Sequence, residues 1–419
     1  MREEFNNRTR AVLVSVAERA SAVEECERSL DELERLLDTA GGECYAKVLQ
    51  VKDSFDPRTC IGSGKVKELA EICSANEIKL VIFDFELSPS QIRNLEEDLG
   101  GVVTVLDRSM LILDIFALHA VTGEGKLQVE LAQLKYSAPR LVGHGTELSR
   151  QGGGIGSRGP GESKLETDRR HLKERVTALE HRLAELEHNR AVMRAKRDRS
   201  GVFKAAIVGY TNAGKSTLLN YLTDAGILSE NKLFATLDPT TRKMELPSGE
   251  SLLLTDTVGF IRKLPHHLVK AFKSTLDEVK YADMLLVVSD INDSEVEEHI
   301  AVTHEVISDL DASDKPIVYV YNKCDVGGES KAGRISENSV AISALTGAGI
   351  DDLLAMIEEE LHRSKRSVEL EVPYAEQSVL SRLYSAYTVE SVDYLDTCVL
   401  VKVKLDAKGL GLYGRYVKA

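Results

Sequence analysis

Apolar and polar positions alternate in short runs along the first 106 residues. Runs rich in Val, Ile and Leu are separated by stretches with an apolar residue every three or four positions, which predicts strands separated by helices. Ser29 and Glu32 have the spacing of a capping box, so a helix should begin there and end at Gly41-Gly42. The expected strands are 10–16, 45–51, 80–83 and 102–106, and the expected helices are 29–37, 64–74 and 88–98. This order predicts a small parallel α/β domain over residues 1–106.

Residues 107–200 show helical spacing without strand-like runs. Residues 109–119 and 126–134 predict two helices, and the glycine-rich stretch 151–163 predicts a mobile loop. After this loop, apolar residues recur at three- and four-residue intervals, which is typical of a coiled-coil seam. The seam consists of Leu165, Leu172, Val176, Leu179, Leu183, Leu186 and Met193.

From residue 201 the chain consists of apolar runs that end in polar or glycine-rich stretches. Buried strands are expected at 205–208, 252–254, 284–290, 317–321 and 340–342, with a helix beginning at 218. This pattern predicts a second α/β domain over residues 201–364. Residues 365–419, with a predicted helix at 377–388 and a strand at 398–405, form a small α+β C-terminal appendage.

Composition limits the partners and the compartment. The 419 residues carry a formal net charge of −14, so contact with nucleic acid would need a local basic surface. The six cysteines form no C-x-x-C pair or Cys/His cluster, which favours a reducing cytoplasm over disulfides or a zinc site. No apolar signal region follows Met1, and no apolar run approaches the roughly 18–20 residues of a membrane span. We expect a cytoplasmic monomer; peripheral membrane contact stays open.

A phosphate-binding loop lies between the predicted strand at 205–208 and the helix from 218. Its glycines let several backbone N–H groups point at one anion, and the positive end of the helix adds to that field. Lys215 can reach the β- and γ-phosphates, and the Ser216 hydroxyl can bind Mg²⁺. The loop consists of Gly209, Tyr210, Thr211, Asn212, Ala213, Gly214, Lys215, Ser216 and Thr217.

Two further stretches are predicted to face the phosphates. The first is Asp256, Thr257, Val258 and Gly259, at the end of a buried strand. Asp256 can hold Mg²⁺ through water, and the Gly259 N–H can sense a γ-phosphate and make the segment a switch. The second is a polar loop over residues 234–241, whose first part is Phe234, Ala235, Thr236, Leu237 and Asp238. One threonine should complete the Mg²⁺ shell; Thr236 fits best, with Thr240 or Thr241 as alternatives.

Two loops are predicted to select the base. The first is Asn322, Lys323, Cys324 and Asp325, and the second is Ser343, Ala344 and Leu345. The Asp325 carboxylate can accept hydrogen bonds from guanine N1–H and N2–H₂, which adenine lacks. Asn322 can bond guanine N7, the Lys323 stem can pack on the ring, and a backbone N–H of the second loop can meet guanine O6. Each motif follows a predicted strand, where ligands of open α/β sheets bind, so together they predict a GTP site.

Two other stretches leave alternatives open. Ile61-Gly62-Ser63-Gly64-Lys65 precedes a predicted helix; a turn and helix cap is favoured over a second nucleotide site. Residues 158–199 contain 12 basic and 8 acidic residues, a net +4 in a chain whose remainder is −18. Such a run is commonly a solvated helix face, but here it offers candidate RNA contacts at Arg158, Arg169 and Arg170.

The nucleotide motifs resemble those of translational GTPases of the Obg/HflX superfamily, over roughly residues 8–364. Residues 152–170, with Gly-Pro-Gly-Glu and Leu-Glu-Thr-Asp-Arg-Arg, closely resemble the HflX family, as does the stretch 61–65. The resemblance implies a GTPase that binds ribosomes, mainly the large subunit, and splits stalled or idle ones. Some members of the family also bind ATP through the N-terminal domain.

Catalysis departs from a common pattern at one position. Many GTPases orient the attacking water with a Gln directly after the glycine of Asp-x-x-Gly, but this chain has Phe260 there. We expect slow intrinsic hydrolysis, with charge stabilisation by Lys215 and Mg²⁺, stimulation by the ribosome, and no assigned general base. The alternatives are an RNA-binding, helicase-like module that uses ATP and GTP on ribosomal RNA, and a scaffold that holds GTP as a structural ligand.

Overall fold

The computed structural model describes residues 8–141, 160–198, 202–223, 233–234, 237–263, 273–326, 331–405 and 407–418. The predicted glycine-rich loop therefore lies largely outside the described residues. The chain divides into two compact units. The first unit is Met1–Leu186 with Glu230–Asp238 and Ile261–Thr275; the second is Glu187–Ser229, Pro239–Phe260 and Leu276–Ala419. Two short segments from the middle of the sequence are thus assigned to the same unit as the N-terminal part of the chain.

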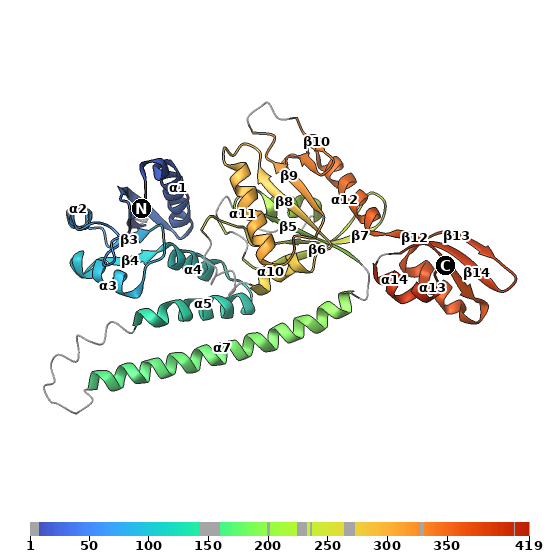
Figure 1. Ribbon diagram of the computed structural model, residues 1–419, viewed down its shortest axis with the longest axis horizontal. Coiled ribbons are helices and arrows are strands. Elements are labelled where there is room, and N and C mark those ends of the chain that lie inside the picture. Colours follow the sequence, from blue (N-terminus) through green and yellow to red (C-terminus); the bar gives the residue numbers. More distant parts are fainter. Residues whose placement is uncertain are drawn as a thin grey trace, which may run out of the picture. The chain divides into compact units, whose positions relative to one another are not determined.

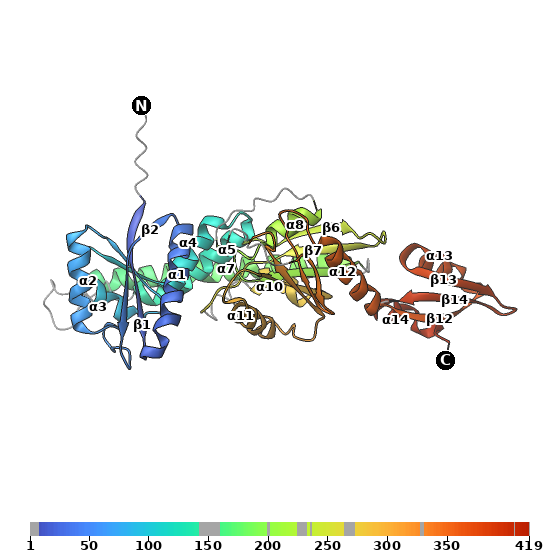
Figure 2. The ribbon, with the colours of Figure 1, turned by 90° about the horizontal axis from the view of Figure 1, so that it is seen from above.

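The first unit contains the predicted parallel sheet. Its strands are β1 (Thr9–Ala17), β2 (Gly42–Val51), β3 (Leu80–Phe83) and β4 (Thr104–Asp107), in the order β2-β1-β3-β4 with every pair parallel. Helices α2 (Ser63–Ala75) and α3 (Pro89–Asp98) cover one face, and α1 (Val23–Thr39) and α4 (Arg108–His119) lie on the other (Figures 1 and 2). Since both faces are covered, the central strand β1 is buried from Ala11 to Ala17.

The predicted capping box at Ser29 is wrong. Helix α1 begins at Val23, six residues earlier, and Ser29 and Glu32 are buried side chains in its middle. Their hydroxyl and carboxylate are used by partners far away in the sequence, described below. The capping box of this unit lies instead at Ser88, which accepts from the Gln91 backbone at the start of α3.

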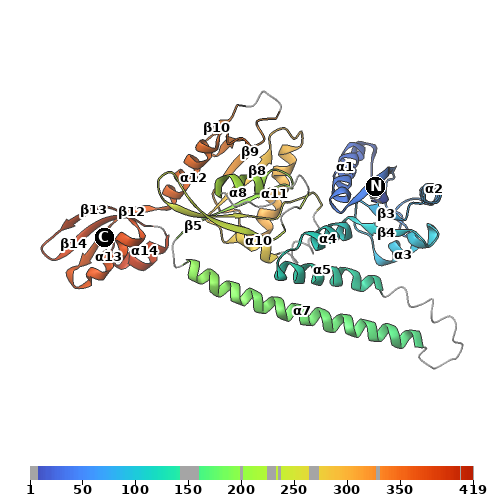
Figure 3. The ribbon, with the colours of Figure 1, turned by 180° about the vertical axis from the view of Figure 1, so that it is seen from behind.

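The helical part of the first unit follows α4. Helix α5 (Gly123–Leu141) lies alongside the long helix α7 (Pro160–Asp198), as Figures 1 and 3 show. Two ion pairs join them, Arg175 to Glu130 at 2.6 Å and Lys135 to Glu180 at 2.7 Å, and Leu179 of the predicted seam is buried. The last four residues of the predicted loop, 160–163, are already helical.

The second unit contains a seven-stranded sheet in the order β10-β11-β9-β8-β5-β7-β6. Its strands are β5 (Phe203–Gly209), β6 (Thr240–Glu245), β7 (Ser251–Asp256), β8 (Met284–Asp290), β9 (Ile317–Asn322), β10 (Gly333–Ser336) and β11 (Ser339–Ala341). The five central strands are parallel, and β6 and β10 are antiparallel edges. The helices are α8 (Lys215–Thr223), α10 (Lys273–Lys280), α11 (Val296–Asp309) and α12 (Ile350–Ser364). All five strands predicted from apolar runs are present.

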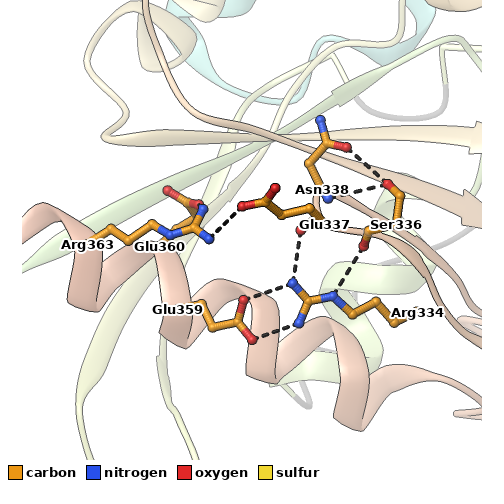
Figure 4. A network of polar contacts seen from close by, with 7 residues as sticks. All are labelled: Arg334, Ser336, Glu337, Asn338, Glu359, Glu360 and Arg363. Carbon is orange, nitrogen blue, oxygen red and sulfur yellow. Dashed lines mark hydrogen bonds and ion pairs between the residues drawn. The ribbon is translucent and has the colours of Figure 1, made fainter.

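A polar network fixes the edge strand β10 to α12 (Figure 4). The Arg334 guanidinium bonds both carboxylate oxygens of Glu359 at 2.7 and 2.9 Å and donates to the carbonyls of Ser336 and Glu337. Glu337 also accepts from Arg363 at 3.0 Å. A bidentate arginine–carboxylate pair is directional as well as strong, so the network holds the strand beside β11, which leads into the loop at Ser343.

The C-terminal appendage is a three-stranded antiparallel sheet in the order β12-β14-β13. Its strands are β12 (Arg366–Pro373), β13 (Thr388–Tyr394) and β14 (Cys398–Leu405), with helices α13 (Gln377–Ala386) and α14 (Ala407–Tyr413). Short 3₁₀ turns complete the chain at Ala20–Ala22, Tyr374–Glu376 and Gly414–Tyr416. Within the described part of the chain, no helix is both long and apolar enough to cross a membrane.

Candidate nucleotide site

The predicted phosphate loop joins the carboxyl end of β5 to the start of α8. Gly209 has φ 142°, and a Cβ there would lie 2.1 Å from the Val288 carbonyl oxygen of the neighbouring strand. Gly214 has φ 91°, and a Cβ there would lie 2.2 Å from the Asn322 side-chain nitrogen. Both positions therefore require glycine, for backbone conformation and for space.

Lys215, the first residue of α8, is buried against this loop. Its Nζ donates to the Tyr210 carbonyl at 2.6 Å. Burial lowers the pKa of Lys215 to about 8, and the negative charge of Asp256 only partly opposes that shift. A buried ammonium at a helix N-terminus is well suited to meet a multiply charged anion.

Ser216 and Asp256 bring a hydroxyl and a carboxylate together. Ser216 Oγ donates to Asp256 Oδ2 at 2.6 Å, and Asp256, the last residue of β7, is fully buried. Thr257 fixes the end of the strand by donating to the Ile207 carbonyl at 2.7 Å. A hydroxyl beside a single carboxylate suits Mg²⁺, because this ion is normally held by one or two carboxylates together with substrate phosphates.

Phe260 connects the end of the Asp-x-x-Gly segment to the phosphate loop. Its N–H donates to the Gly209 carbonyl at 3.1 Å, and its carbonyl accepts from the Thr211 N–H at 2.8 Å. The Phe260 side chain is 1% exposed, so it packs in the core and does not face solvent. A Cβ on Gly259 would lie 2.7 Å from Thr211 Cγ2 and 2.9 Å from Lys215 Nζ, so this backbone lies directly against the lysine.

Asn322 links three loops at the carboxyl end of β9. Its Nδ2 donates to the Ala213 carbonyl at 2.9 Å, and its Oδ1 accepts from the Ala344 N–H at 2.9 Å. Lys323, with φ 66°, pairs with Asp290 at 2.8 Å, while Asp325 is exposed. The buried Cys324 anchors the loop by donating its N–H to the Ile342 carbonyl at 3.1 Å.

Most backbone N–H groups of the loop from Ser343 donate hydrogen bonds within the protein. The N–H groups of Ser343, Ala344, Thr346 and Gly347 each donate within the protein. The amide of Leu345, whose residue is 76% exposed, has no acceptor among the described residues. Of the three residues predicted to meet guanine O6, Ser343, Ala344 and Leu345, the last is therefore the best placed to donate to a ligand.

Some predicted residues do not join this group. Ala235, Thr236 and Arg158 lie outside the described residues. Phe234, Leu237 and Asp238 belong to the first unit. Arg169 and Arg170 are exposed on α7. Gly62 caps α2, and its N–H donates to Gln50 Oε1 at 2.8 Å, in agreement with the favoured turn and cap.

Sequence reasoning missed the support behind Tyr210. Its ring stacks on His299 of α11, with centroids 3.7 Å apart and an interplanar angle of 13°. His299 in turn pairs with Asp293 at 3.2 Å. No local pattern links residues nearly ninety positions apart, so only the fold reveals this contact.

Family models match four consecutive parts of the chain. They are described as GTP-binding GTPase N-terminal (residues 27–117), GTP-binding GTPase middle region (119–197), 50S ribosome-binding GTPase (204–323) and HflX C-terminal domain (329–411). The last match extends the family resemblance into the C-terminal appendage.

Similar proteins cover most of the chain. A GTPase HflX of Lacrimispora saccharolytica is 50% identical over 88% of this chain and 86% of its own length. Those of Caldanaerobacter subterraneus (48%; 97% and 93%) and Escherichia coli (44%; 86% and 85%) are also similar. A solved GTP-binding protein of Sulfolobus solfataricus in complex with GDP is 25% identical, covering 84% of this chain and 99% of that chain with a TM-score of 0.44. The chain belongs to the GTPase HflX family and is a GTPase.

Proposed function

We propose that this GTPase binds Mg·GTP at the site on β5, β7 and β9, associates with the large ribosomal subunit, and splits stalled or idle ribosomes. The observation that carries the nucleotide part is the convergence of three loops on Asn322, which joins the phosphate loop to the loop at Ser343. The phosphate-facing and base-facing residues thereby form one assembly at the carboxyl edge of a parallel sheet, where ligands of such sheets bind.

In this proposal the phosphates lie in the loop Gly209–Thr217. Lys215 exchanges its bond to the Tyr210 carbonyl for the β- and γ-phosphates, and the N-terminal amides of α8 bond the same oxygens. Guanine lies against the Lys323 stem, with its N1–H and N2–H₂ bonded to the exposed Asp325 carboxylate and its O6 to the Leu345 amide.

Ser216, Asp256 through a water, and Thr236 would hold the Mg²⁺ ion. The pairing of Ser216 Oγ and Asp256 Oδ2 at 2.6 Å supports this assignment, because both are hard oxygen donors in one place. When bound, the ion neutralises charge on the β- and γ-phosphates.

Hydrolysis rests on charge stabilisation by Lys215 and the loop amides. Phe260 cannot orient water, because its side chain is apolar and buried and its backbone is bonded to the phosphate loop. The intrinsic reaction should therefore be slow, and the ribosome should supply or order the missing group. No residue of the chain is assigned as a general base.

Two observations support the ribosomal partner. The family model that matches residues 204–323 is described as a 50S ribosome-binding GTPase. The exposed Arg169 and Arg170 of α7 offer cations to RNA phosphates, with Arg158 as a third candidate. Contacts of this kind read RNA backbone and shape, since A-form helices expose little base information.

Co-sedimentation with ribosomal subunits tests the proposal. Purified protein is mixed with separated subunits in GDP or in a non-hydrolysable GTP analogue, and sucrose gradients with intact ribosomes report splitting. We expect binding to the large subunit and loss of intact ribosomes with the GTP analogue, and weaker effects with GDP. Equal sedimentation with both nucleotides, or none with either, would contradict the proposed function.

A further inference from the structure

A buried cluster of charges lies in the first unit. Arg108, at the start of α4, is 2% exposed and donates to Asp84 at 2.7 Å and to Glu32 of α1. The two carboxylates are 0% and 4% exposed. Charges this deep are strongly destabilising unless they are paired.

Residues 262 and 263 complete the cluster. Lys263 Nζ lies 2.8 Å from Asp84 Oδ2 and 3.0 Å from Ser29 Oγ, and Arg108 donates to the Arg262 carbonyl at 3.1 Å. Two carboxylates then face two cations. Burial alone raises the pKa of Asp84, but the charges of Arg108 and Lys263 outweigh it and hold that pKa below its ordinary value. Of the ion pairs named here, removal of Lys263 leaves two carboxylates facing one cation.

The cluster occupies the position where an open α/β sheet normally holds a ligand. In the order β2-β1-β3-β4, the chain changes direction between β1 and β3. Asp84 follows β3 directly, and its N–H donates to the Val14 carbonyl of β1 at 2.9 Å. Ligands bind at the carboxyl ends of strands at such switch points. Here the ligand is Lys263 of the same chain.

A second segment is held by the same unit. Asp238 Oδ2 accepts from the N–H groups of Val121 and Thr122, both at 2.9 Å, just before α5. The Phe234 ring packs edge-on against Phe116, with centroids 4.8 Å apart. Phe234 and Lys263 have φ 58° and 52°, a region that costs a non-glycine residue roughly 1–2 kcal/mol. In both segments, contacts with the N-terminal part of the chain offset the free-energy cost of the strained backbone.

We propose that the Glu32–Asp84–Arg108 cluster is a latch that holds Lys263, and with it the segment after Gly259, in the arrangement that favours GDP over GTP. The proposal rests on the proposed nucleotide site. Asp238 and Phe234 hold the other segment predicted to face the phosphates to the same unit. A movement of either segment therefore changes its contacts with the N-terminal part of the chain. Lys263 and Asp84 are positioning residues; neither touches the nucleotide.

The direction follows from the space around Lys215. Gly259 lies so close to Lys215 Nζ that even a Cβ would be 2.9 Å away. In the proposed site both the Lys215 ammonium and the Gly259 N–H are assigned to the γ-phosphate, so we infer that a γ-phosphate entering between these two groups separates them and shifts residues 257–260. The chain runs from Phe260 through Ile261 to the latched residues, so this shift strains the latch. Binding free energies are reciprocal: if GTP favours the state with broken latch contacts by a given factor, then breaking those contacts must raise the affinity for GTP relative to GDP by the same factor.

Equilibrium titration of the full chain with fluorescent GDP and a fluorescent non-hydrolysable GTP analogue tests this. The variants are Lys263→Met, the double variant Asp84→Asn with Lys263→Met, and a control, Lys47→Met, which breaks ion pairs with the exposed carboxylates of Asp31 and Glu34 in the same unit. We expect both latch variants to shift the ratio of Kd values toward the GTP analogue by about 5-fold or more, and the control to shift it less than about 2-fold.

The double variant separates the latch from a purely structural role. Lys263→Met alone removes one of the two cationic partners of the buried Asp84 and should lower Tm. The double variant removes one negative and one positive charge and keeps the Glu32–Arg108 pair. Its Tm should therefore recover, while the ratio of the Kd values for GDP and the GTP analogue stays shifted. A ratio unchanged in both variants, or one that returns to the wild-type value as Tm recovers, would overturn the latch. Absence of binding of either nucleotide to the wild-type chain would instead overturn the proposed site.

Discussion

Asn322 and Ala213 are joined by a 2.9 Å hydrogen bond from the asparagine side chain to the alanine carbonyl. The same side chain accepts from Ala344 at 2.9 Å, so one buried amide sets the distance between the phosphate loop and the loop at Ser343. Gly214 makes this possible, since a Cβ there would lie 2.2 Å from Asn322 Nδ2. The geometry of both ends of the proposed nucleotide site therefore depends on a single residue.

Replacing Asn322 with Ala should damage binding and stability together. The buried Ala213 carbonyl and Ala344 N–H would each lose a partner, at a cost of about 1–3 kcal/mol per group. We expect a lower midpoint in urea unfolding and weaker binding of fluorescent GDP. Asn94→Ala is a matched control, because it removes a 3.0 Å bond from an asparagine side chain to the Arg58 carbonyl outside the nucleotide loops. Equal losses in the two variants would contradict the linking role.

GTP affinity should fall as the pH rises through about 8, where burial has lowered the pKa of Lys215. The phosphates raise that pKa, so binding takes up a proton whenever the free lysine is deprotonated. Titrations from pH 7 to pH 10 in wild type and in Lys215→Met measure this directly. Weak binding of the variant with no such pH dependence is expected; a wild-type affinity independent of pH would contradict the assignment.

The lowered pKa of Lys215 also predicts how the stability of the nucleotide-free protein depends on pH. The folded-state pKa lies below that of an unfolded lysine, so the buried ammonium destabilises the fold below pH 8, and this cost is relieved as the pH rises from about 8 to 10.5. The shift corresponds to about 3 kcal/mol. Lys215→Met should therefore be at least as stable as wild type at pH 7, with the difference shrinking toward pH 10. A large loss of stability at pH 7 would contradict this.

Phe260→Gln should not create a catalytic water-binding group. The side chain at this position is 1% exposed, and the backbone on both sides is bonded to Gly209 and Thr211. A glutamine would put a polar amide into an apolar space and lower Tm. Intrinsic hydrolysis, measured as phosphate release in single turnover, should stay at or below the wild-type rate. A clear acceleration would show that this side chain does reach the attacking water.

Local patterns were sufficient for much of the fold. The strands β5, β7, β8 and β9 and the presence of α8 follow from runs of apolar residues and from the glycines of the phosphate loop, because these signals act between neighbours in sequence; the helix begins at Lys215, three residues before the predicted start. Ser29 and Glu32 show the opposite case. Their spacing matches a cap, but Glu32 pairs with Arg108, 76 residues away, and Ser29 with Lys263, 234 residues away. A long-range charge requirement outweighed the local pattern there.

The basic face of α7 should contribute to binding through RNA phosphates. Neutralising Arg158, Arg169 and Arg170 to Gln should weaken association with the large subunit and reduce its salt dependence, because fewer counterions are released. GTP binding should be unchanged. Arg8→Gln with Arg58→Gln removes two exposed cations elsewhere and serves as control. Identical sedimentation of the triple variant and wild type at every salt concentration would leave these arginines as a solvated helix face.

The most direct test of the account exchanges the base. Asp325→Asn replaces the carboxylate proposed to bind guanine with an amide suited to xanthine, which has a carbonyl where guanine has an amino group. Ribosome splitting by this variant is then measured by sucrose gradient with GTP and with xanthosine triphosphate. The account predicts that the variant splits ribosomes with xanthosine triphosphate and fails with GTP, while wild type does the reverse. Splitting by the folded variant with GTP at the wild-type level would contradict it.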